Sequence, residues 1–186
     1  RNLDFKGKRV AVSGSGNVSQ YAIQKVNQLG GIPISASDSN GTIIDEGGID
    51  AKKLEFLFDL KNNRRGRIKD YADKHNVKYF EGKSVWEVIK EQGLKVDIAL
   101  PCATQNELDE SLAQGLVAAG CYLVSEGANM PSDLNAIKVF QENNFLYGPA
   151  KAANAGGVAV SGLEMSQNSM RLLWSREEVD AKLLGI

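Results

Sequence analysis

The chain has 186 residues, and its 22 Lys and Arg side chains nearly balance its 23 Asp and Glu side chains, which leaves a formal net charge of −1. This balance argues against capture of nucleic acid or of an anionic membrane by charge. No apolar run reaches the length of a membrane span, and the length suits a single domain. Two cysteines make no disulfide framework, so we expect a reduced, cytoplasmic setting.

The first informative stretch runs from an apolar strand through a glycine-rich turn into a helix. The strand is expected at Val10–Val12, and apolar spacings of three and four predict a helix over Val18–Leu29. A helix N-terminus carries unpaired N–H groups and partial positive charge, so it attracts a pyrophosphate. Gly14 permits the tight turn and Gly16 permits close approach of the phosphates, while Ser19 stands where glycine or alanine is usual. An ordinary glycine-rich turn is the alternative. The residues expected at the coenzyme are Ser13, Gly14, Ser15, Gly16, Asn17 and Val18.

A second strand is predicted over Ile32–Ser37, after a helix stop at Gly30-Gly31. Asp38 ends this strand at about the spacing from Gly14 that suits the acid hydrogen-bonded to an adenosine ribose. The alternative role for Asp38 is that of a loop or capping aspartate. Thr42–Ile44 is expected to form a small additional strand.

A group of cations follows the helix that is predicted over Asp50–Asp59. If Lys61, Arg64 and Arg67 fold toward the end of the second strand, they form a clamp for a 2′-phosphate. The alternative is a solvated helix face, which is the usual role of a charge run. The next helix is predicted over Ile68–His75, and its histidine is expected at the surface rather than in a catalytic cluster.

Strands and helices alternate through the second half of the chain, which is typical of a parallel, doubly wound sheet. The predicted fold class is therefore α/β, with a Rossmann-like, mostly parallel sheet and helices on both faces. Ligands of such sheets lie over the C-terminal ends of the strands, where neutral side chains suit a ribose and a carboxamide. Those side chains are Thr104, Asn106, Asn129 and Asn154. The predicted strands are Val77–Phe80, Val96–Leu100, Tyr122–Val124 and Phe145–Tyr147, and the predicted helices are Val85–Glu91, Leu112–Ala119, Asp133–Asn143, Val158–Leu173 and Glu177–Leu184.

Five motifs stand in a specific order along the chain: GSGNV from Gly14, SDS from Ser37, PCATQNEL from Pro101, EGANMP from Glu126 and KAANAGGVAVSGLEM from Lys151. Their order and spacing resemble the coenzyme-binding domain of hexameric, NADP-dependent glutamate dehydrogenases. The resemblance covers nearly the whole chain from Lys6. Ser19 and Ala150 are modest departures, since the family more often has alanine and glycine at these positions.

The resemblance implies hydride transfer between NADP(H) and L-glutamate, or 2-oxoglutarate plus ammonia. It places the pyrophosphate at the glycine turn and the adenosine ribose at Asp38 and Ser39, and it supports the 2′-phosphate clamp. Ala103, Thr104 and Asn129 are implied along the nicotinamide. The residues implied near the substrate are Asn154, Val158 and Ser161.

The resemblance also implies that the catalytic lysine and aspartate belong to another, N-terminal domain, so no catalytic residue is expected in this chain. No metal site is expected either. The chain begins with Arg1 instead of Met, and we expect residues 1–186 to be a dinucleotide-binding fragment that lacks the N-terminal domain and the last helices. Such a fragment should be monomeric and inactive, whereas the full-length enzyme is implied to be a homohexamer.

Alternative functions follow from the same motifs. Asp38 by itself favours NAD, because a carboxylate repels a 2′-phosphate. Three converging cations and the Ser39 hydroxyl can offset this repulsion, so NADP is expected, with NAD as the alternative. The chain could belong to a leucine, valine or phenylalanine dehydrogenase, although the Ser161 hydroxyl suits a carboxylate side chain better. A non-catalytic dinucleotide-sensing module is the third alternative. The sequence leaves the reactivity of Cys102 open, and the place of this residue beside the expected nicotinamide pocket makes alkylation a useful probe.

Overall fold

A five-stranded parallel sheet forms the centre of the fold in this computed structural model, which describes residues 4–186. Arg1, on which the expectation of a fragment partly rests, lies outside the described residues. The strand order is β2-β1-β6-β7-β8, and every pair is parallel. The strands are β1 (Arg9–Val12), β2 (Ile32–Pro33), β6 (Ile98–Leu100), β7 (Leu123–Ser125) and β8 (Leu146–Gly148).

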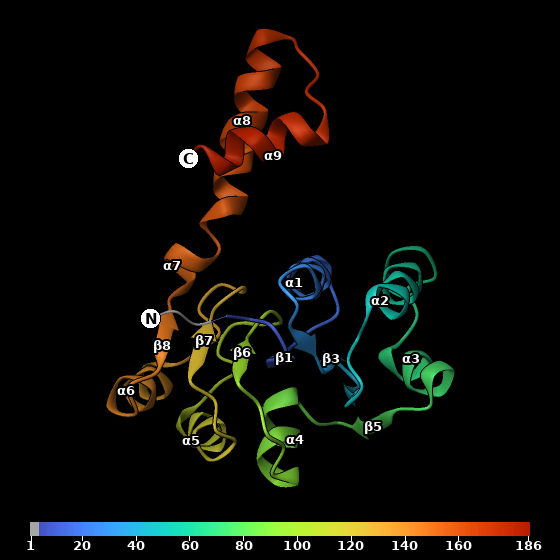
Figure 1. Cartoon of the computed structure of the whole chain (residues 1–186), viewed down its shortest axis with the longest axis vertical. Helices are drawn as coiled ribbons and strands as arrows, with labels where there is room; N and C mark the ends of the chain where they lie inside the picture. The colour runs from blue at the N-terminus through green and yellow to red at the C-terminus, as the bar shows by residue number, and fades with distance from the viewer. Residues whose placement is uncertain (1–3) are drawn as a thin grey trace.

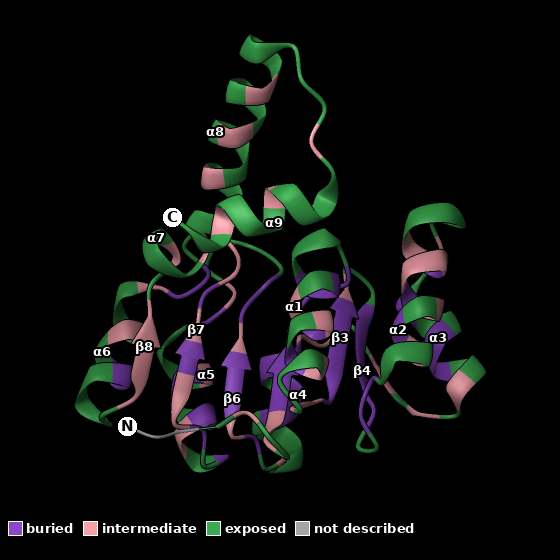
Figure 2. Ribbon diagram, turned by 45° about the horizontal axis from the view of Figure 1, so that its top comes forward, coloured by how far each residue is buried: buried purple, intermediate pink, exposed green. Residues whose placement is uncertain are grey.

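Helices cover both faces of this sheet (Figure 1), as the sequence predicts. Alternate residues of β1 face opposite ways: Val10 and Val12 pack with Ile23 of one helix, while Ala11 packs with Trp86 on the other side. Figure 2 shows that the central strands are buried. The first face carries α1 (Asn17–Gln28), and the second carries α4 (Val85–Gln92), α5 (Glu110–Ala118) and α6 (Leu134–Glu142).

A second, antiparallel sheet lies beside the parallel one. The sequence analysis did not distinguish the strands of the two sheets. It consists of β3 (Ser35–Asp38), β4 (Gly41–Ile44) and β5 (Lys78–Glu81). The small additional strand is therefore confirmed, whereas the predicted strand at 77–80 belongs to the second sheet. Three helical elements accompany it: α2 (Ala51–Phe58), the π-helical turn η1 (Asp59–Asn63) and α3 (Ile68–His75).

The prediction of one continuous strand over Ile32–Ser37 is wrong, because the chain changes sheets at residue 34. The backbone still pairs with β1 at Ile34, whose N–H donates to the carbonyl of Val10 at 2.9 Å, and beyond it the Ser35 hydroxyl takes over the pairing with β1. Its Oγ accepts from the N–H of Val12 and donates to the carbonyl of Val12, both at 2.9 Å. The backbone of β3 is thereby free to pair with β4.

The order of the parallel strands creates a switch point between β1 and β6. From β1 the chain moves outward to β2, and it then returns to lay β6 along the opposite side of β1. The connections on the two sides of this point run in opposite directions, which leaves a crevice above the C-terminal ends of β1 and β6.

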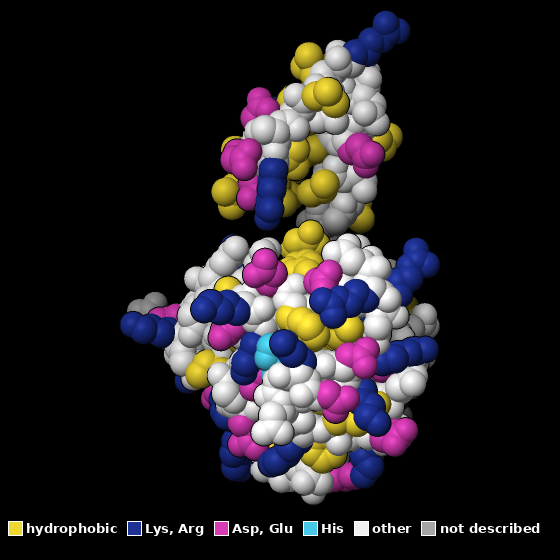
Figure 3. Space-filling model, turned by 90° about the vertical axis from the view of Figure 1, so that its right-hand side faces the viewer, with side chains coloured by type: hydrophobic (Ala, Val, Ile, Leu, Met, Phe, Trp, Pro, Cys, Tyr) yellow, Lys and Arg dark blue, Asp and Glu magenta, His cyan; other side chains and the backbone are white. Residues whose placement is uncertain are grey.

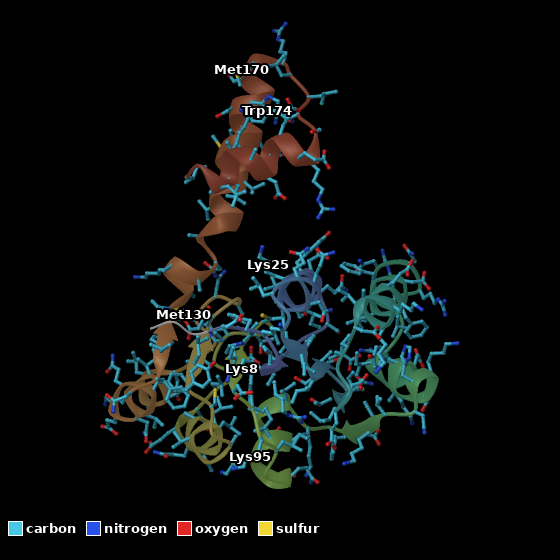
Figure 4. The ribbon with its side chains drawn as sticks, viewed as in Figure 1. Lys8, Lys25, Lys95, Met130, Met170 and Trp174 are labelled. Atoms are coloured by element: carbon cyan, nitrogen blue, oxygen red, sulfur yellow. The ribbon has the colours of Figure 1, made fainter. Side chains whose placement is uncertain are left out.

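The last three helices project away from the rest of the molecule (Figures 1 and 3). They are α7 (Ala150–Ala153), α8 (Ala155–Met170) and α9 (Arg176–Leu184), so helix formation begins earlier than the predicted Val158. The α9 helix packs against α8, and Trp174 lies between them, with Lys182 above its ring (Figure 4). Within residues 4–186, no helix combines the length and apolar character that a membrane crossing requires.

His75 is more buried than the sequence analysis predicted. Its ring packs against Tyr71 and Phe56, with centroid distances of 4.5 and 5.2 Å. Burial lowers the pKa of His75, and the positive charge of Lys53 acts in the same direction. The histidine is thus part of the packing between α2 and α3.

Candidate functional site

Hydrogen bonds from two neighbouring strands fix the glycine turn between β1 and α1. The Ser13 hydroxyl accepts from the N–H of Cys102 at 2.8 Å, which ties the end of β1 to the end of β6. The N–H of Gly14 donates to Ser37 Oγ at 2.8 Å, and the N–H of Ser37 donates back to the carbonyl of Gly14 at 3.0 Å. Ser13, one of the predicted coenzyme residues, is therefore buried beneath the turn and has a structural role here.

The two glycines of the turn are required for different reasons. Gly14 has a φ of +81°, and a Cβ there would lie 3.1 Å from the carbonyl oxygen of Cys102, so the fold itself requires glycine. A Cβ on Gly16 would meet no protein atom within 4 Å. The surface above Gly16 is open, and a ligand can approach the backbone closely at this point.

The α1 helix begins at this open surface without a side-chain cap. Gly16 is its N-cap, no side chain accepts from the first turn, and that turn contains no acidic residue. The unpaired N–H groups and the helix dipole therefore face the crevice, where they favour an anion. Ser19 fits the small-residue position because its hydroxyl donates to the carbonyl of Gly16 at 2.9 Å.

A cavity of about 710 Å³ lies directly above the switch point, between the glycine turn and the end of β3. A second cavity of about 560 Å³ continues from it and shares Val18, Cys102 and Ala103 as lining residues. Together they form a trough, here called the coenzyme trough. Its predicted residues are Gly14, Ser15, Gly16, Asn17, Val18, Asp38, Ser39, Ala103, Thr104, Asn129, Asn154 and Val158.

Asp38 lines the trough, but its carboxylate is occupied by protein groups. Oδ2 accepts from the N–H of Ile68 at 2.8 Å, and Oδ1 accepts from the N–H of Asn40 at 2.9 Å. The Lys61 ammonium lies 3.5 Å from Oδ2, and the carboxylate side chain is only 8% exposed. The capping role that the sequence left open for Asp38 is therefore present, and a cation compensates its charge.

The three cations of the predicted clamp do not converge on the trough. Arg67 donates to the hydroxyl of Ser39 at 3.0 Å, at the end of β3. Lys61 turns inward toward Asp38 and donates to the carbonyl of Gly66 at 2.8 Å. Arg64 turns outward, where it pairs with Asp59 at 2.5 Å and lies above the ring of Phe56.

At the far end of the trough two asparagines are joined. Asn154 Nδ2 donates to Asn129 Oδ1 at 2.8 Å, which links α7 to the loop after β7. Val158 lies one turn farther along α8. The Ser161 hydroxyl donates to the carbonyl of Gly157 at 3.2 Å, and Asn106 lines a different cavity, next to Met130.

Glu107 is a trough residue that the sequence analysis did not identify. Its Oε1 accepts from the N–H groups of Ala103 and Thr104 at 3.0 and 3.3 Å, and its Oε2 accepts from Trp86 Nε1 at 2.7 Å. Burial raises the pKa of Glu107 although these hydrogen bonds oppose the shift. The position of an acid inside the PCATQNEL loop was the available signal. Glu107 holds the loop that forms the floor of the trough.

Cys102 is a poor target for alkylation despite its place at the trough. Burial raises the pKa of its thiol to about 12, and the charge of Glu107 adds to the effect. The thiolate is the reactive form, so little of it exists at neutral pH. Among residues 4–186, no three His, Cys, Asp or Glu side chains gather closely enough to hold a metal ion.

The parallel sheet, its switch point and the glycine turn at a helix tip define an α/β protein of the Rossmann class. The chain belongs to the Glutamate/Leucine/Phenylalanine/Valine dehydrogenase family, whose model matches residues 1–186.

Individual relatives agree with this assignment. The chain is 59% identical to an NAD(P)-specific glutamate dehydrogenase of Xylanibacter ruminicola over 186 residues, which are 100% of this chain and 40% of that protein. It is 53% identical to the NADP-specific glutamate dehydrogenase of Escherichia coli over 97% of this chain and 39% of the relative. Among solved structures, glutamate dehydrogenase 2 of Plasmodium falciparum matches with a TM-score of 0.89 and 46% identity, covering 98% of this chain and 39% of that chain. The chain thus spans about 40% of the length of the curated relatives that it matches.

Proposed function

We propose that this chain is the coenzyme-binding part of a glutamate dehydrogenase, which transfers hydride between NADP(H) and L-glutamate, or 2-oxoglutarate plus ammonia. The observation that carries the proposal is the uncapped N-terminus of α1 at the open Gly16 surface, directly above the switch point. Family membership and the NADP-specific glutamate dehydrogenases among the relatives support the particular reaction.

The trough suggests how the coenzyme lies. The pyrophosphate takes the N-terminus of α1, the adenosine ribose lies toward Ser39, and the nicotinamide lies over Ala103 toward Asn154. Bound in this way, the coenzyme supplies the hydride-accepting or hydride-donating ring. The protein residues fix its orientation and leave one face of the ring toward Val158, where the substrate is proposed to bind.

NADP is the coenzyme we propose, with NAD as the alternative. A bare carboxylate after the second strand repels a 2′-phosphate, but Asp38 is paired with Lys61 and hydrogen-bonded to Ile68. Arg67, held at the Ser39 hydroxyl, then offers a guanidinium and Ser39 a hydroxyl to the phosphate. Of the three cations expected in the clamp, only Arg67 is then proposed to contact the 2′-phosphate. Lys61 contributes by compensating the negative charge of Asp38.

The substrate assignment rests on α8 and on the relatives. Val158 and Ser161 are three residues apart on this helix and so share a face. A hydroxyl at this position suits the side-chain carboxylate of glutamate, whereas leucine, valine or phenylalanine would favour an apolar residue. We further propose that the acid and base groups are supplied by another part of the full-length polypeptide, and that the full-length enzyme is a cytoplasmic homohexamer.

Titration calorimetry of this chain with NADPH and NADH tests the proposal. Wild type should bind both, NADPH more tightly. Gly16→Ala should weaken both by about tenfold or more, on the order of 1.4 kcal/mol, because its Cβ projects where the phosphates approach. The matched control is Gly162→Ala on α8, which also adds a Cβ in open space and should leave both affinities unchanged. Equal binding by wild type and Gly16→Ala would place the phosphates elsewhere and refute the assignment.

A further inference from the structure

The carboxylate of Glu107, in the floor of the coenzyme trough, faces hydrogen-bond donors. Oε1 accepts from the N–H groups of Ala103 and Thr104 at 3.0 and 3.3 Å, and Oε2 accepts from Trp86 Nε1 at 2.7 Å. The Ser13 hydroxyl also donates to this carboxylate, which opposes the rise in pKa that burial causes. A protonated carboxyl group would need an acceptor for its O–H, whereas these four partners are donors. The arrangement therefore favours Glu107 as an anion.

No ion pair among residues 4–186 neutralises this carboxylate. The ion pairs there use five other acids, which are Asp38, Asp45, Glu46, Asp59 and Glu91. Lys83 lines the larger cavity of the trough, but its ammonium is paired with Glu91. Glu107 is partly buried, and a charge in such surroundings is screened less than one in open water. Its effect therefore extends beyond the groups that it touches.

The end of the trough that is proposed to hold the nicotinamide lies next to this charge. Ala103, whose N–H is bonded to Glu107, lines both cavities of the trough. In the described part of the chain, no charged side chain lines the smaller cavity. Cys102 also lines both cavities, and the charge of Glu107 helps to raise the pKa of its thiol. The negative potential of Glu107 is therefore felt where the two cavities meet.

The two forms of the coenzyme differ in charge at one place. The nicotinamide ring carries a positive charge in NADP⁺ and none in NADPH, while the adenosine, the 2′-phosphate and the pyrophosphate are the same in both. A fixed negative charge near the ring lowers the free energy of the NADP⁺ complex and leaves that of the NADPH complex nearly unchanged. The ratio of the two dissociation constants therefore reports the electrostatic potential at the ring.

We propose that Glu107 is a specificity-determining residue that favours the oxidised coenzyme over the reduced one. Its carboxylate attracts the positive ring through the loop of Ala103 and Thr104, without touching it. The inference rests on the proposed function, since it takes the nicotinamide to lie over Ala103. It assigns to Glu107 a role in addition to holding the floor of the trough.

The test is titration calorimetry of the 186-residue chain and its variants with NADP⁺ and with NADPH. Glu107→Gln should raise the ratio of the NADP⁺ to the NADPH dissociation constant about fivefold, because the attraction to the positive ring is lost. Glu110→Gln is the matched control, since this acid is exposed at the start of α5 and screened by solvent. It should leave the ratio unchanged. A ratio that is equal in wild type and in folded Glu107→Gln would overturn the inference.

Two further variants separate the charge of Glu107 from its structural role. Trp86→Phe removes one hydrogen bond to the carboxylate but keeps the charge, so it should change both affinities by the same factor. Glu107→Asp also keeps the charge, and its ratio should lie closer to that of wild type than to that of Glu107→Gln. If Trp86→Phe moves the ratio as far as Glu107→Gln does, distortion of the floor is the cause and the inference is wrong.

A measurement on wild type decides the matter if Glu107→Gln does not fold by circular dichroism. Coupling between two sites is reciprocal, so the pKa of Glu107, followed by ¹³C carboxyl NMR, should be lower with NADP⁺ bound than with NADPH bound. Equal pKa values in the two complexes would refute the inference. Wild type that binds neither form would refute the proposed function and this inference together, whereas binding of both forms with an insensitive ratio would refute the inference alone.

Discussion

Arg67 and Arg64 are three residues apart, yet their guanidinium groups are used differently. Arg67 reaches Ser39 at the rim of the trough, whereas Arg64 pairs with Asp59 and covers Phe56. The spacing of the two arginines in the sequence cannot predict their different contacts, because the π-helical turn η1 and the positive φ of Arg65 redirect the chain between them.

Arg67→Ala should therefore lower NADPH affinity about tenfold, since a charge-assisted hydrogen bond to phosphate is lost. NADH affinity should stay the same because NADH has no 2′-phosphate. Arg64→Ala is the matched control, and it should change NADPH affinity by less than about threefold, as expected of an exposed ion pair. Titration calorimetry of each variant and of the wild type with NADPH and with NADH measures these affinities. A larger loss from Arg64→Ala than from Arg67→Ala would show that Arg64 swings into the trough on binding.

At the scale of elements, the switch of the chain from one sheet to the other depends on Ser35. Its buried hydroxyl satisfies both the N–H and the carbonyl of Val12 where no strand backbone does so. Ser35→Ala leaves both groups of Val12 buried and unpaired, and each costs about 1–3 kcal/mol. We expect the free energy of unfolding to fall by about 2 kcal/mol or more.

Urea denaturation followed by circular dichroism measures this loss, which should appear as a lower midpoint with an unchanged m-value. Ser39→Ala serves as the control, because its hydroxyl lies on the exposed surface and should change stability by less than about 0.5 kcal/mol. A Ser35→Ala midpoint equal to that of Ser39→Ala would mean that the chain repairs the pairing in another way.

The same region marks the limit of what the sequence predicts about the elements. The strand–turn–helix at Gly14 and the parallel alternation were predictable, because apolar periodicity and glycine positions are local properties. The separate antiparallel sheet was not predictable, since β5 pairs with β4 across the three intervening helical elements α2, η1 and α3. The roles of Lys61 and Glu107 depend likewise on contacts with distant residues.

At the scale of the whole molecule, two buried thiols should make the fold sensitive to alkali. Burial raises the pKa of both Cys102 and Cys121 to about 12 from the ordinary value of 9.0. Below pH 9 both folded and unfolded thiols are protonated, so stability is unaffected. Between pH 9 and 12 the unfolded chain loses these protons while the folded chain keeps them, so the free energy of unfolding falls as pH rises.

Within that window each thiol should contribute a slope of about −1.4 kcal/mol per pH unit. Burial also raises the pKa of the Tyr71 hydroxyl, but tyrosine contributes equally in every cysteine variant. Comparing slopes therefore isolates the thiols, even if replacement lowers stability at every pH. Urea denaturation between pH 8 and about pH 10.5 should show a shallower fall in Cys102→Ala and in Cys121→Ala, and the shallowest fall in the double variant. If all four proteins lose stability in parallel, the thiols ionise as readily in the folded chain as in the unfolded one, and the packing around β6 is looser than the structure indicates.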